Sequence, residues 1–172
     1  MISLFMPKEA LTNQQVYVDY LKERIYGVLT LMAVNVGLLM SAEKLTIAYA
    51  SITIVFTTFG LWSASMLASY TAHRVAHDSA LSGYRWGHEL VVHRGLVLAG
   101  LPSLLMLMLA GLGFIDLSTA LLADIALSVV SLLVTLAKSA KTKENSLKTA
   151  VLVGVAHCIV VSVIILLKSL AK

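Results

Sequence analysis

The sequence predicts an all-α integral membrane protein with five transmembrane helices, its N-terminus in the cytoplasm and its C-terminus external. Composition is the first reason, because the 172 residues are 59% hydrophobic and only 13% charged, with a mean hydropathy of +0.90. A soluble domain is about 25% charged, so lipid is the expected solvent. Two further observations support this: five apolar segments can each cross about 30 Å of hydrocarbon, and basic residues gather on alternate connections.

Five continuous apolar runs, rich in Leu, Ala and Met, are the predicted spans. They cover residues 25–42, 45–72, 95–115, 117–137 and 149–167. Helices are favoured over strands because a membrane barrel shows short segments of alternating hydrophobicity. Residues 1–24 precede the spans as a cytoplasmic tail in which apolar and polar residues are interleaved. Both an interfacial amphipathic helix and an extension of the first span fit that pattern.

Basic residues set the predicted orientation. Of the 13 lysine and arginine residues, all except Lys44, Lys168 and Lys172 lie in the tail, in the second-to-third connection or in the fourth-to-fifth connection. Short loops rich in Lys and Arg stay in the cytoplasm, so those three regions are expected inside. Membrane topology thus explains the basic pI near 9.3, and we expect no nucleic-acid partner. We expect a multi-pass protein of a cell or organelle membrane, the inner membrane if the source is bacterial.

One face of the second span carries the most informative side chains. Helical spacing places five residues on a common stripe: Trp62, Met66, Tyr70, His73 and His77. Two imidazoles at positions i and i+4 can bind one metal ion, and imidazole suits Zn, Cu, Fe and Ni. The alternative is that these interfacial histidines are solvated or contact lipid head groups.

Further candidate ligands flank that stripe. The connection after the second span adds His88, Glu89 and His93, and Glu23 stands at the cytoplasmic mouth of the first span. For Glu23, an ion pair with a nearby lysine or arginine competes with the role of metal ligand. The complete predicted metal site is His73, His77, His88, His93, Glu23 and Met66.

Two ionisable residues fall inside predicted spans, Asp124 in the fourth and His157 in the fifth. Such residues are costly in hydrocarbon and suggest function by default. A carboxyl and an imidazole can exchange a proton near physiological pH, so we expect Asp124 and His157 to relay protons. A structural polar clasp between the two helices is the alternative. Asn35 in the first span is expected to make an interhelical hydrogen bond.

Three stretches resemble the vacuolar iron transporter family. Residues 26–30, Tyr-Gly-Val-Leu-Thr, are similar to the start of its first helix. Residues 65–70, Ser-Met-Leu-Ala-Ser-Tyr, resemble its helix-two motif of a small residue, Met and Glu-Tyr. Residues 136–154 are similar to its basic junction between helices four and five. The resemblance implies a five-span fold with the N-terminus inside, a homodimer and transport of a metal ion.

The chain also departs from that family's pattern. Ser69 stands where the family has its helix-two Glu, and residues 29–34 lack its helix-one Asp. The Glu-rich cytoplasmic insert is shortened here, and histidines dominate it. Of the family's ligands only Met66 carries over, which leaves the metal open among Fe, Zn, Mn and Co.

Together these observations predict a membrane transporter of a divalent transition metal ion, coupled to protons. Cytoplasmic histidines would gather the metal, Met66 and Tyr70 would line its route, and Glu23 would stand at the entrance. Two other classes stay open: a non-transporting integral membrane subunit of a larger complex, and a small haem or redox membrane protein that uses a histidine pair. No nucleophile motif or phosphate-binding loop points to an enzyme.

Overall fold

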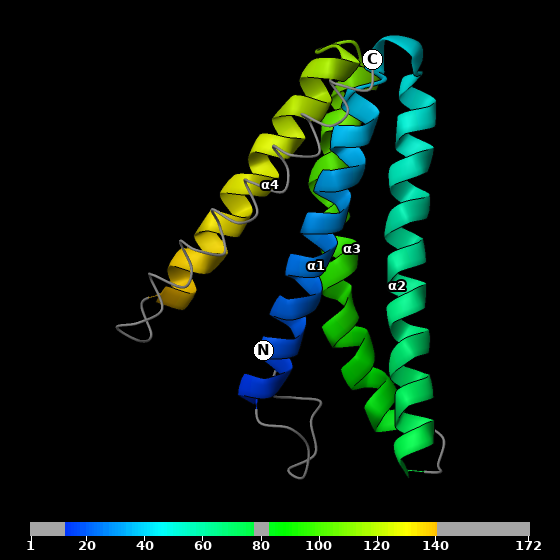
Figure 1. Ribbon diagram of the computed structural model, residues 1–172, viewed down its shortest axis with the longest axis vertical. Coiled ribbons are helices and arrows are strands. Elements are labelled where there is room, and N and C mark those ends of the chain that lie inside the picture. The colour runs from blue at the N-terminus through cyan, green and yellow to red at the C-terminus, as the bar shows by residue number, and fades with distance from the viewer. Residues whose placement is uncertain (1–12, 78–82, 141–172) are drawn as a thin grey trace. The chain divides into compact units, whose positions relative to one another are not determined.

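A computed structural model of the chain describes residues 13–77 and 83–140, and every regular element in those ranges is a helix (Figure 1). The elements are α1 (Asn13–Leu39), the short 3-10 helix η2 (Ala42–Lys44), α2 (Ile47–His77), α3 (Gly83–Gly111) and α4 (Leu117–Ala140). The prediction of an all-helical chain is therefore confirmed for this part. The predicted fifth span, residues 149–167, lies outside the described residues.

Three of the described helices are long and apolar enough to cross a membrane. Their apolar stretches are Ile47–Val75, Trp86–Gly111 and Leu117–Thr135, which correspond to the second, third and fourth predicted spans. Large apolar side chains are exposed on their outer faces, including Phe56 and Phe59 of α2. Exposed apolar surface on this scale is unfavourable in water and suits hydrocarbon. The chain is an α-helical membrane protein.

α1 begins before the predicted first span, within the tail, and ends before residue 42. The helix begins at Asn13 and runs without a break into the predicted first span, so residues 13–24 extend that helix. It ends at Leu39, because the Ser41 N–H bonds the Leu38 carbonyl at 3.0 Å and starts a tight turn. Charged side chains at Lys22, Glu23 and Arg24 lie within it, and α1 is not among the three apolar helices.

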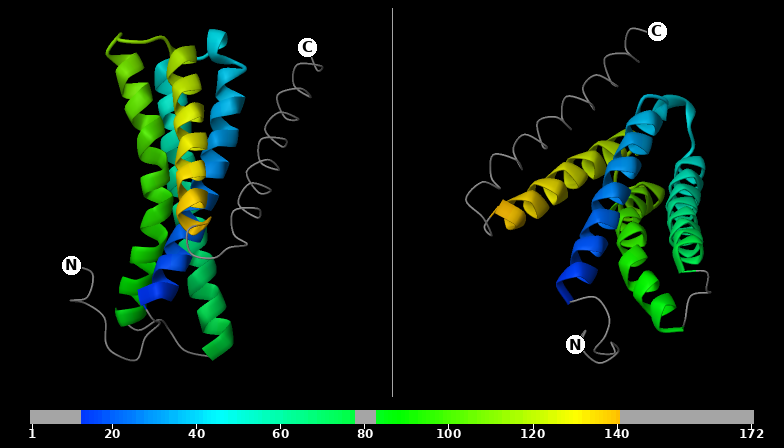
Figure 2. Two further views of the ribbon diagram at one scale, coloured as in Figure 1. Left: turned by 90° about the vertical axis from the view of Figure 1, so that its left-hand side faces the viewer. Right: turned by 60° about the horizontal axis from the view of Figure 1, so that its bottom comes forward.

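The start of α3 also differs, since it lies at Gly83 and not near residue 95. Arg85, Glu89 and Arg94 lower the local hydropathy, so the sequence pattern suggests a connection where the helix in fact continues. His88 and His93 therefore belong to a helix and not to a loop. Figure 2 shows α3 as one continuous ribbon, although Pro102 lies inside it.

Two turns set the starts of α2 and α4. Thr46 caps α2, because its Oγ1 accepts a hydrogen bond of 3.2 Å from the Tyr49 N–H. Asp116 caps α4 by accepting hydrogen bonds from the N–H and the hydroxyl of Thr119, at 3.0 and 2.6 Å. Those bonds, the hydroxyl's first, hold the pKa of Asp116 below its ordinary value. The cap therefore stabilises α4 at pH values above the ordinary pKa of Asp116. This stabilisation is lost as the pH falls through the lowered pKa of the folded protein.

Gly113 ends α3 in a left-handed conformation, with φ of +81°. The Gly113 N–H bonds the Ala110 carbonyl at 3.0 Å, and the Phe114 N–H bonds the Leu109 carbonyl at 3.1 Å. This pair of bonds is a Schellman motif, which satisfies carbonyls that the helix end would otherwise leave open.

The helices divide into two compact units. The first unit takes in the chain up to Leu31 together with Ser51–Leu104, and the second takes in Met32–Ala50 together with the chain from Leu105 onward. In the second unit, η2 contacts α4, and Asn35 of α1 donates a hydrogen bond to Asp124 of α4. Its buried core includes Val36, Leu107 and Leu121.

Glycines let the three helices of the first unit approach closely. An ideal Cβ at Gly27 of α1 would lie 3.0 Å from the Ala99 Cβ of α3, and one at Gly95 would lie 2.9 Å from the Tyr20 carbonyl oxygen of α1. At Gly100 of α3 it would lie 2.6 Å from Thr58 Oγ1 of α2. Small residues at such contacts are the usual means of close packing between membrane helices.

We expect Gly100→Ala to destabilise the protein by about 1–3 kcal/mol, the usual cost of overpacking. The new methyl group cannot displace Thr58 freely, because the Thr58 hydroxyl donates a 2.8 Å hydrogen bond to the Ile54 carbonyl. Gly60→Ala is the matched control, since an ideal Cβ there meets nothing within 4 Å. It should instead stabilise α2 by about 0.5–1 kcal/mol. Unfolding in detergent micelles measures both, and equal stabilities would contradict the close approach.

Candidate functional site

His93 of α3 is the centre of a buried polar group in the first unit. Only 2% of the residue is exposed. Its Nε2 atom lies 3.0 Å from Glu89 Oε2, one turn earlier on α3, and 3.1 Å from Ser69 Oγ on α2. Its Nδ1 atom lies 3.7 Å from Glu23 Oε2 on α1. One imidazole ring therefore contacts side chains from three helices.

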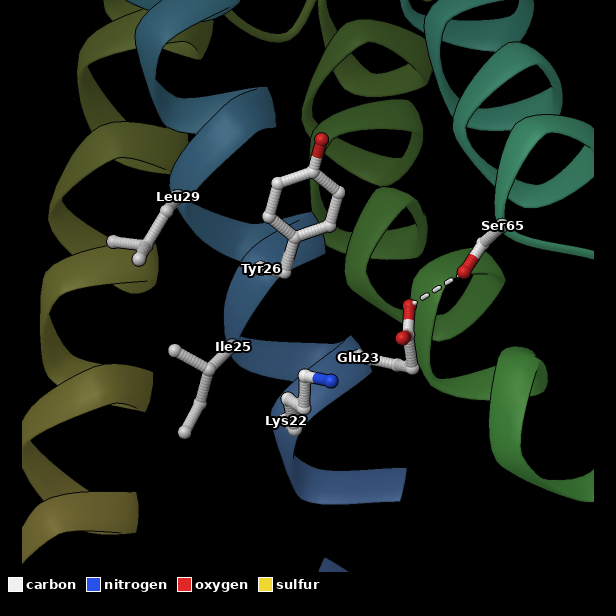
Figure 3. Close-up of a pocket in the computed structure, with 6 residues that line it drawn as sticks. All are labelled: Lys22, Glu23, Ile25, Tyr26, Leu29 and Ser65. Atoms are coloured by element: carbon white, nitrogen blue, oxygen red, sulfur yellow. Dashed lines mark hydrogen bonds between the residues drawn. The ribbon is translucent and has the colours of Figure 1, made fainter. Parts of the chain in front are cut away.

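Glu23 connects this ring to a pocket. Its Oε2 atom accepts a hydrogen bond of 3.0 Å from the Ser65 hydroxyl of α2, drawn as the dashed line in Figure 3. The pocket beside it has a volume of about 650 Å³ and is lined by Lys22, Glu23, Ile25, Tyr26, Leu29 and Ser65. The Glu23 side chain remains 16% exposed. A single carboxylate thus borders both the pocket and the buried histidine.

The two carboxylates lie at opposite edges of the imidazole ring, Glu89 at Nε2 and Glu23 at Nδ1. When both are ionised, they bring two negative charges to a group in apolar surroundings. Buried charges persist only when they are paired and hydrogen-bonded. The Ser65 hydroxyl donates such a bond to Glu23, and the Ser69 hydroxyl contacts the imidazole. The described residues contain no group of three His, Cys, Asp or Glu side chains arranged to hold a metal ion.

Aromatic and basic side chains border this group. The Arg94 guanidinium lies 5.5 Å from the centre of the Tyr20 ring, a cation–π contact between α3 and α1. Tyr70 of α2 stacks on Trp86 of α3 with 6.0 Å between ring centres, and Arg74 Nη1 donates to the Tyr70 hydroxyl at 3.2 Å. Arg94 therefore contacts an aromatic ring. The Glu23 carboxylate contacts Ser65 and His93.

Of the predicted metal ligands, the structure brings Glu23 and His93 together. Met66 and His73 are half-buried on α2, and His88 is half-buried on α3. His88 precedes His93 by five residues, so the two point to different sides of α3. The side chain of His77 and the whole of His157 lie outside the described residues. The four-histidine site therefore stays a prediction, and Glu23 lies 3.7 Å from the His93 ring.

Ser65 and Ser69 are absent from the predicted site, and Glu89 is noted beside His88 and His93 without being counted among the ligands. Glu89 precedes His93 by four residues, which brings the two side chains together on a helix. That signal is visible in the sequence once residues 83–94 are recognised as helical. Ser65 and Ser69 are likewise one turn apart, on the stripe of α2 that continues the buried Ile54 and Thr58.

A second buried polar pair lies in the second unit. Asn35 of α1 and Asp124 of α4 are 0% and 1% exposed, and the Asn35 Nδ2 atom donates a hydrogen bond to Asp124 Oδ2. Asn35 therefore makes the interhelical hydrogen bond that the sequence predicts. The predicted contact between Asp124 and His157 falls outside the described residues.

A double-mutant cycle tests the Glu23–His93 contact. We expect Glu23→Gln and His93→Gln to be non-additive, with a coupling energy of about 0.5–3 kcal/mol, because residues in one hydrogen-bonded group share their interaction energy. Glu43→Gln on the exposed η2 is the matched control and should be additive with His93→Gln to within about 0.5 kcal/mol. Equal coupling in the two cycles, measured by unfolding in micelles, would argue against the contact.

No protein-family model, curated protein or solved structure matches the chain. The likeness to the vacuolar iron transporter family rests on the three stretches of sequence quoted above.

Proposed function

We propose that this chain is a multi-pass membrane transporter of a divalent transition-metal cation. In this proposal the chain crosses the membrane five times, with its N-terminus in the cytoplasm and its C-terminus external. The observation that carries the proposal is the group of Glu23 on α1 and His93 and Glu89 on α3, beside a pocket that Glu23 borders.

The free-energy cost of placing Glu23, His93 and Glu89 in largely apolar surroundings supports the proposal. Ionisable side chains inside membrane helices are rare, and they usually mark the path of an ion or a proton. Two ionised carboxylates and a neutral imidazole carry two negative charges, which one divalent cation balances. Carboxylate oxygen and imidazole nitrogen are also ligand types that Fe, Zn, Mn and Co accept.

Glu23 is the residue that takes the cation from the pocket. In the ground state its carboxylate is shared between the Ser65 hydroxyl and the nearby His93 ring, so a cation only has to replace these partners. A site with few protein ligands holds the ion weakly, and transport requires binding that is weak enough for release. A closed cage of protein ligands would suit storage better.

A relationship to the vacuolar iron transporter family is part of this proposal, and with it a homodimer. One contact bears on the main departure from that family. Ser69 stands where the family has Glu, and here it contacts His93 Nε2 at 3.1 Å, the same atom that Glu89 contacts at 3.0 Å. Glu89 of α3 thus supplies a carboxylate close to the position where α2 lacks one.

Reporter fusions test the proposed topology. A reporter fused after Lys143 should read cytoplasmic and one fused after Lys172 should read external, because basic loops stay inside. Both reporters on the same side would eliminate the fifth span.

Flux assays test the proposed transport. Liposomes with the protein and an internal metal indicator should take up at least one of Fe²⁺, Zn²⁺, Mn²⁺ and Co²⁺. Glu23→Gln and His93→Gln should each reduce uptake and metal affinity by about 10–100-fold, the usual effect of losing a partner at a metal site. Glu43→Gln, an exposed carboxylate on η2, should leave uptake unchanged.

The same assay separates the two candidate metal sites. The double variant His73→Ala, His77→Ala should keep most of the uptake if Glu23 and His93 bind the cation. Loss of uptake in that variant alone would move the site to the α2 histidines. No uptake by the parent protein with any of the four ions would favour the non-transporting subunit.

A further inference from the structure

A basic and aromatic group lies where α2 ends and α3 begins, two segments that lie side by side in Figure 1. Tyr70 of α2 stacks on Trp86 of α3, with 6.0 Å between the ring centres and 23° between the ring planes. Arg74, one turn after Tyr70, donates a hydrogen bond of 3.2 Å from Nη1 to the Tyr70 hydroxyl. All three residues belong to the first unit. Two helices therefore hold one guanidinium beside a stacked pair of rings.

The ends of two apolar stretches place this group at the boundary of the membrane. The apolar stretch of α2 ends at Val75, directly after Arg74, and that of α3 begins at Trp86. The lipid phosphates lie just outside the hydrocarbon that such stretches cross. Tyr and Trp are enriched at this level because each combines an apolar ring with a polar atom. The Arg74 guanidinium is therefore at the depth of the phosphate layer.

Arg74 has donors left for an anion. Arginine carries five N–H donors in a planar fork, and it is always charged in proteins. Within residues 13–77 and 83–140, its hydrogen-bond partner is the Tyr70 hydroxyl, and the ion pairs found there are those of His93 with Glu23 and Glu89. No carboxylate in this part of the chain neutralises the guanidinium.

We propose that Arg74, Tyr70 and Trp86 form a binding site for the phosphate of one phospholipid from the surrounding bilayer. The guanidinium binds the phosphate oxygens through its remaining donors, because its planar fork matches phosphate geometry. The Tyr70 hydroxyl accepts the Nη1 hydrogen bond and so orients the guanidinium, while the Trp86 ring supports the Tyr70 ring. This inference does not depend on the proposed transport function.

Exposed leucines continue the site into the apolar region. Leu67 precedes Arg74 by two turns of α2 and is 65% exposed, and Leu90 follows Trp86 by one turn of α3 and is 49% exposed. These spacings keep each pair of side chains on one stripe of its helix. From the boundary inward, the surface offers a cation, an aromatic pair and aliphatic side chains. A phospholipid has the matching order of phosphate, glycerol and acyl chain, whereas free phosphate matches the cation alone.

A structural role for Arg74 is the alternative. A cation in the last turn of a helix interacts favourably with the helix dipole, and lysine serves that purpose as well as arginine. Lysine lacks the planar fork, so it cannot hold the Tyr70 hydroxyl and a phosphate in the same arrangement. Arg74→Lys therefore distinguishes a built phosphate site from a positive charge at a helix end.

Native mass spectrometry of the full-length protein in detergent micelles tests the site with dioleoyl phosphatidylglycerol. The parent should retain one such lipid, and Arg74→Lys should weaken its retention by about tenfold, the effect of losing one hydrogen bond to a charged group. Tyr70→Phe keeps the ring but removes the acceptor, and it should weaken retention by about twofold to tenfold. Lys44→Gln, an exposed cation on η2, should leave retention unchanged.

The same measurement contains the results that would overturn the proposal. Dioleoylglycerol has the same acyl chains and no phosphate, so equal retention of the two lipids would reject a phosphate site. Retention by Arg74→Lys equal to that of the parent would leave only the charge at the helix end. Displacement of the lipid by inorganic phosphate would indicate an anion site without a lipid. Asp78, one turn after Arg74, lies outside the described residues, and retention by Asp78→Asn but not by the parent would assign Arg74 to an ion pair.

Photo-crosslinking locates the lipid in a bilayer. The host liposomes are digalactosyldiacylglycerol, which carries no phosphate, and the probe is phosphatidylglycerol with a diazirine in its acyl chain. Labelling should be higher around Leu67 and Leu90 than around Phe56 and Phe59, which are exposed elsewhere on α2. Arg74→Lys should lower this ratio while the unfolding temperature stays the same. The same ratio in parent and variant would mean that bulk lipid alone covers this surface, and the proposal would fail.

Discussion

Hydrocarbon offers no hydrogen-bond partner, so a polar side chain buried between membrane helices must find its partner on a neighbouring helix. His93 meets this constraint at one ring nitrogen, where Nε2 lies within hydrogen-bond distance of Glu89 and Ser69, while Nδ1 faces the Glu23 carboxylate at 3.7 Å. Leaving a buried polar group unsatisfied typically costs about 1–3 kcal/mol. The register of α1, α2 and α3 in the first unit is therefore tied to the positions of these side chains, because sliding one helix would separate several partners at once.

Those contacts also require helices that lie close together, since serine side chains are short. The small residues of α3 provide this. A Cβ at Gly95 would meet the backbone of α1, and a Cβ at Gly100 would meet Thr58 of α2. His93 lies just before this glycine-containing stretch, so the close approach persists to the level of the polar group. Packing and polar contacts are thus two parts of one arrangement: larger residues would hold the helices apart and separate Glu23 from Ser65 and His93 from Ser69.

Hydropathy predicted the helical class and three of the apolar helices well, because length and composition decide whether a segment crosses a membrane. It failed at the start of α3, where Arg85, Glu89 and Arg94 interrupt the apolar pattern without ending the helix. The choice of helical face was less predictable. In α2 the residue types favour the stripe with Met66 and Tyr70 as the functional face. The contacts to Glu23 and His93 are instead made by Ser65 and Ser69. In a membrane the outer face is as apolar as the inner one, so periodicity gives little indication of which stripe faces a neighbour.

The two buried groups share α1, which contributes Glu23 to one and Asn35 to the other. Both contacts thereby constrain the rotation of the same helix. Neutral polar side chains would constrain this rotation with a smaller desolvation cost. The Thr58 hydroxyl, for example, donates its hydrogen bond to a carbonyl of its own helix. The chain instead places three carboxyl groups and an imidazole in these positions. Packing alone does not account for that choice, since replacing buried ionic groups by apolar ones is often neutral or stabilising. Ionisable side chains inside membrane helices usually mark the path of an ion or a proton, and this general tendency is the strongest physical reason for the proposed transport function.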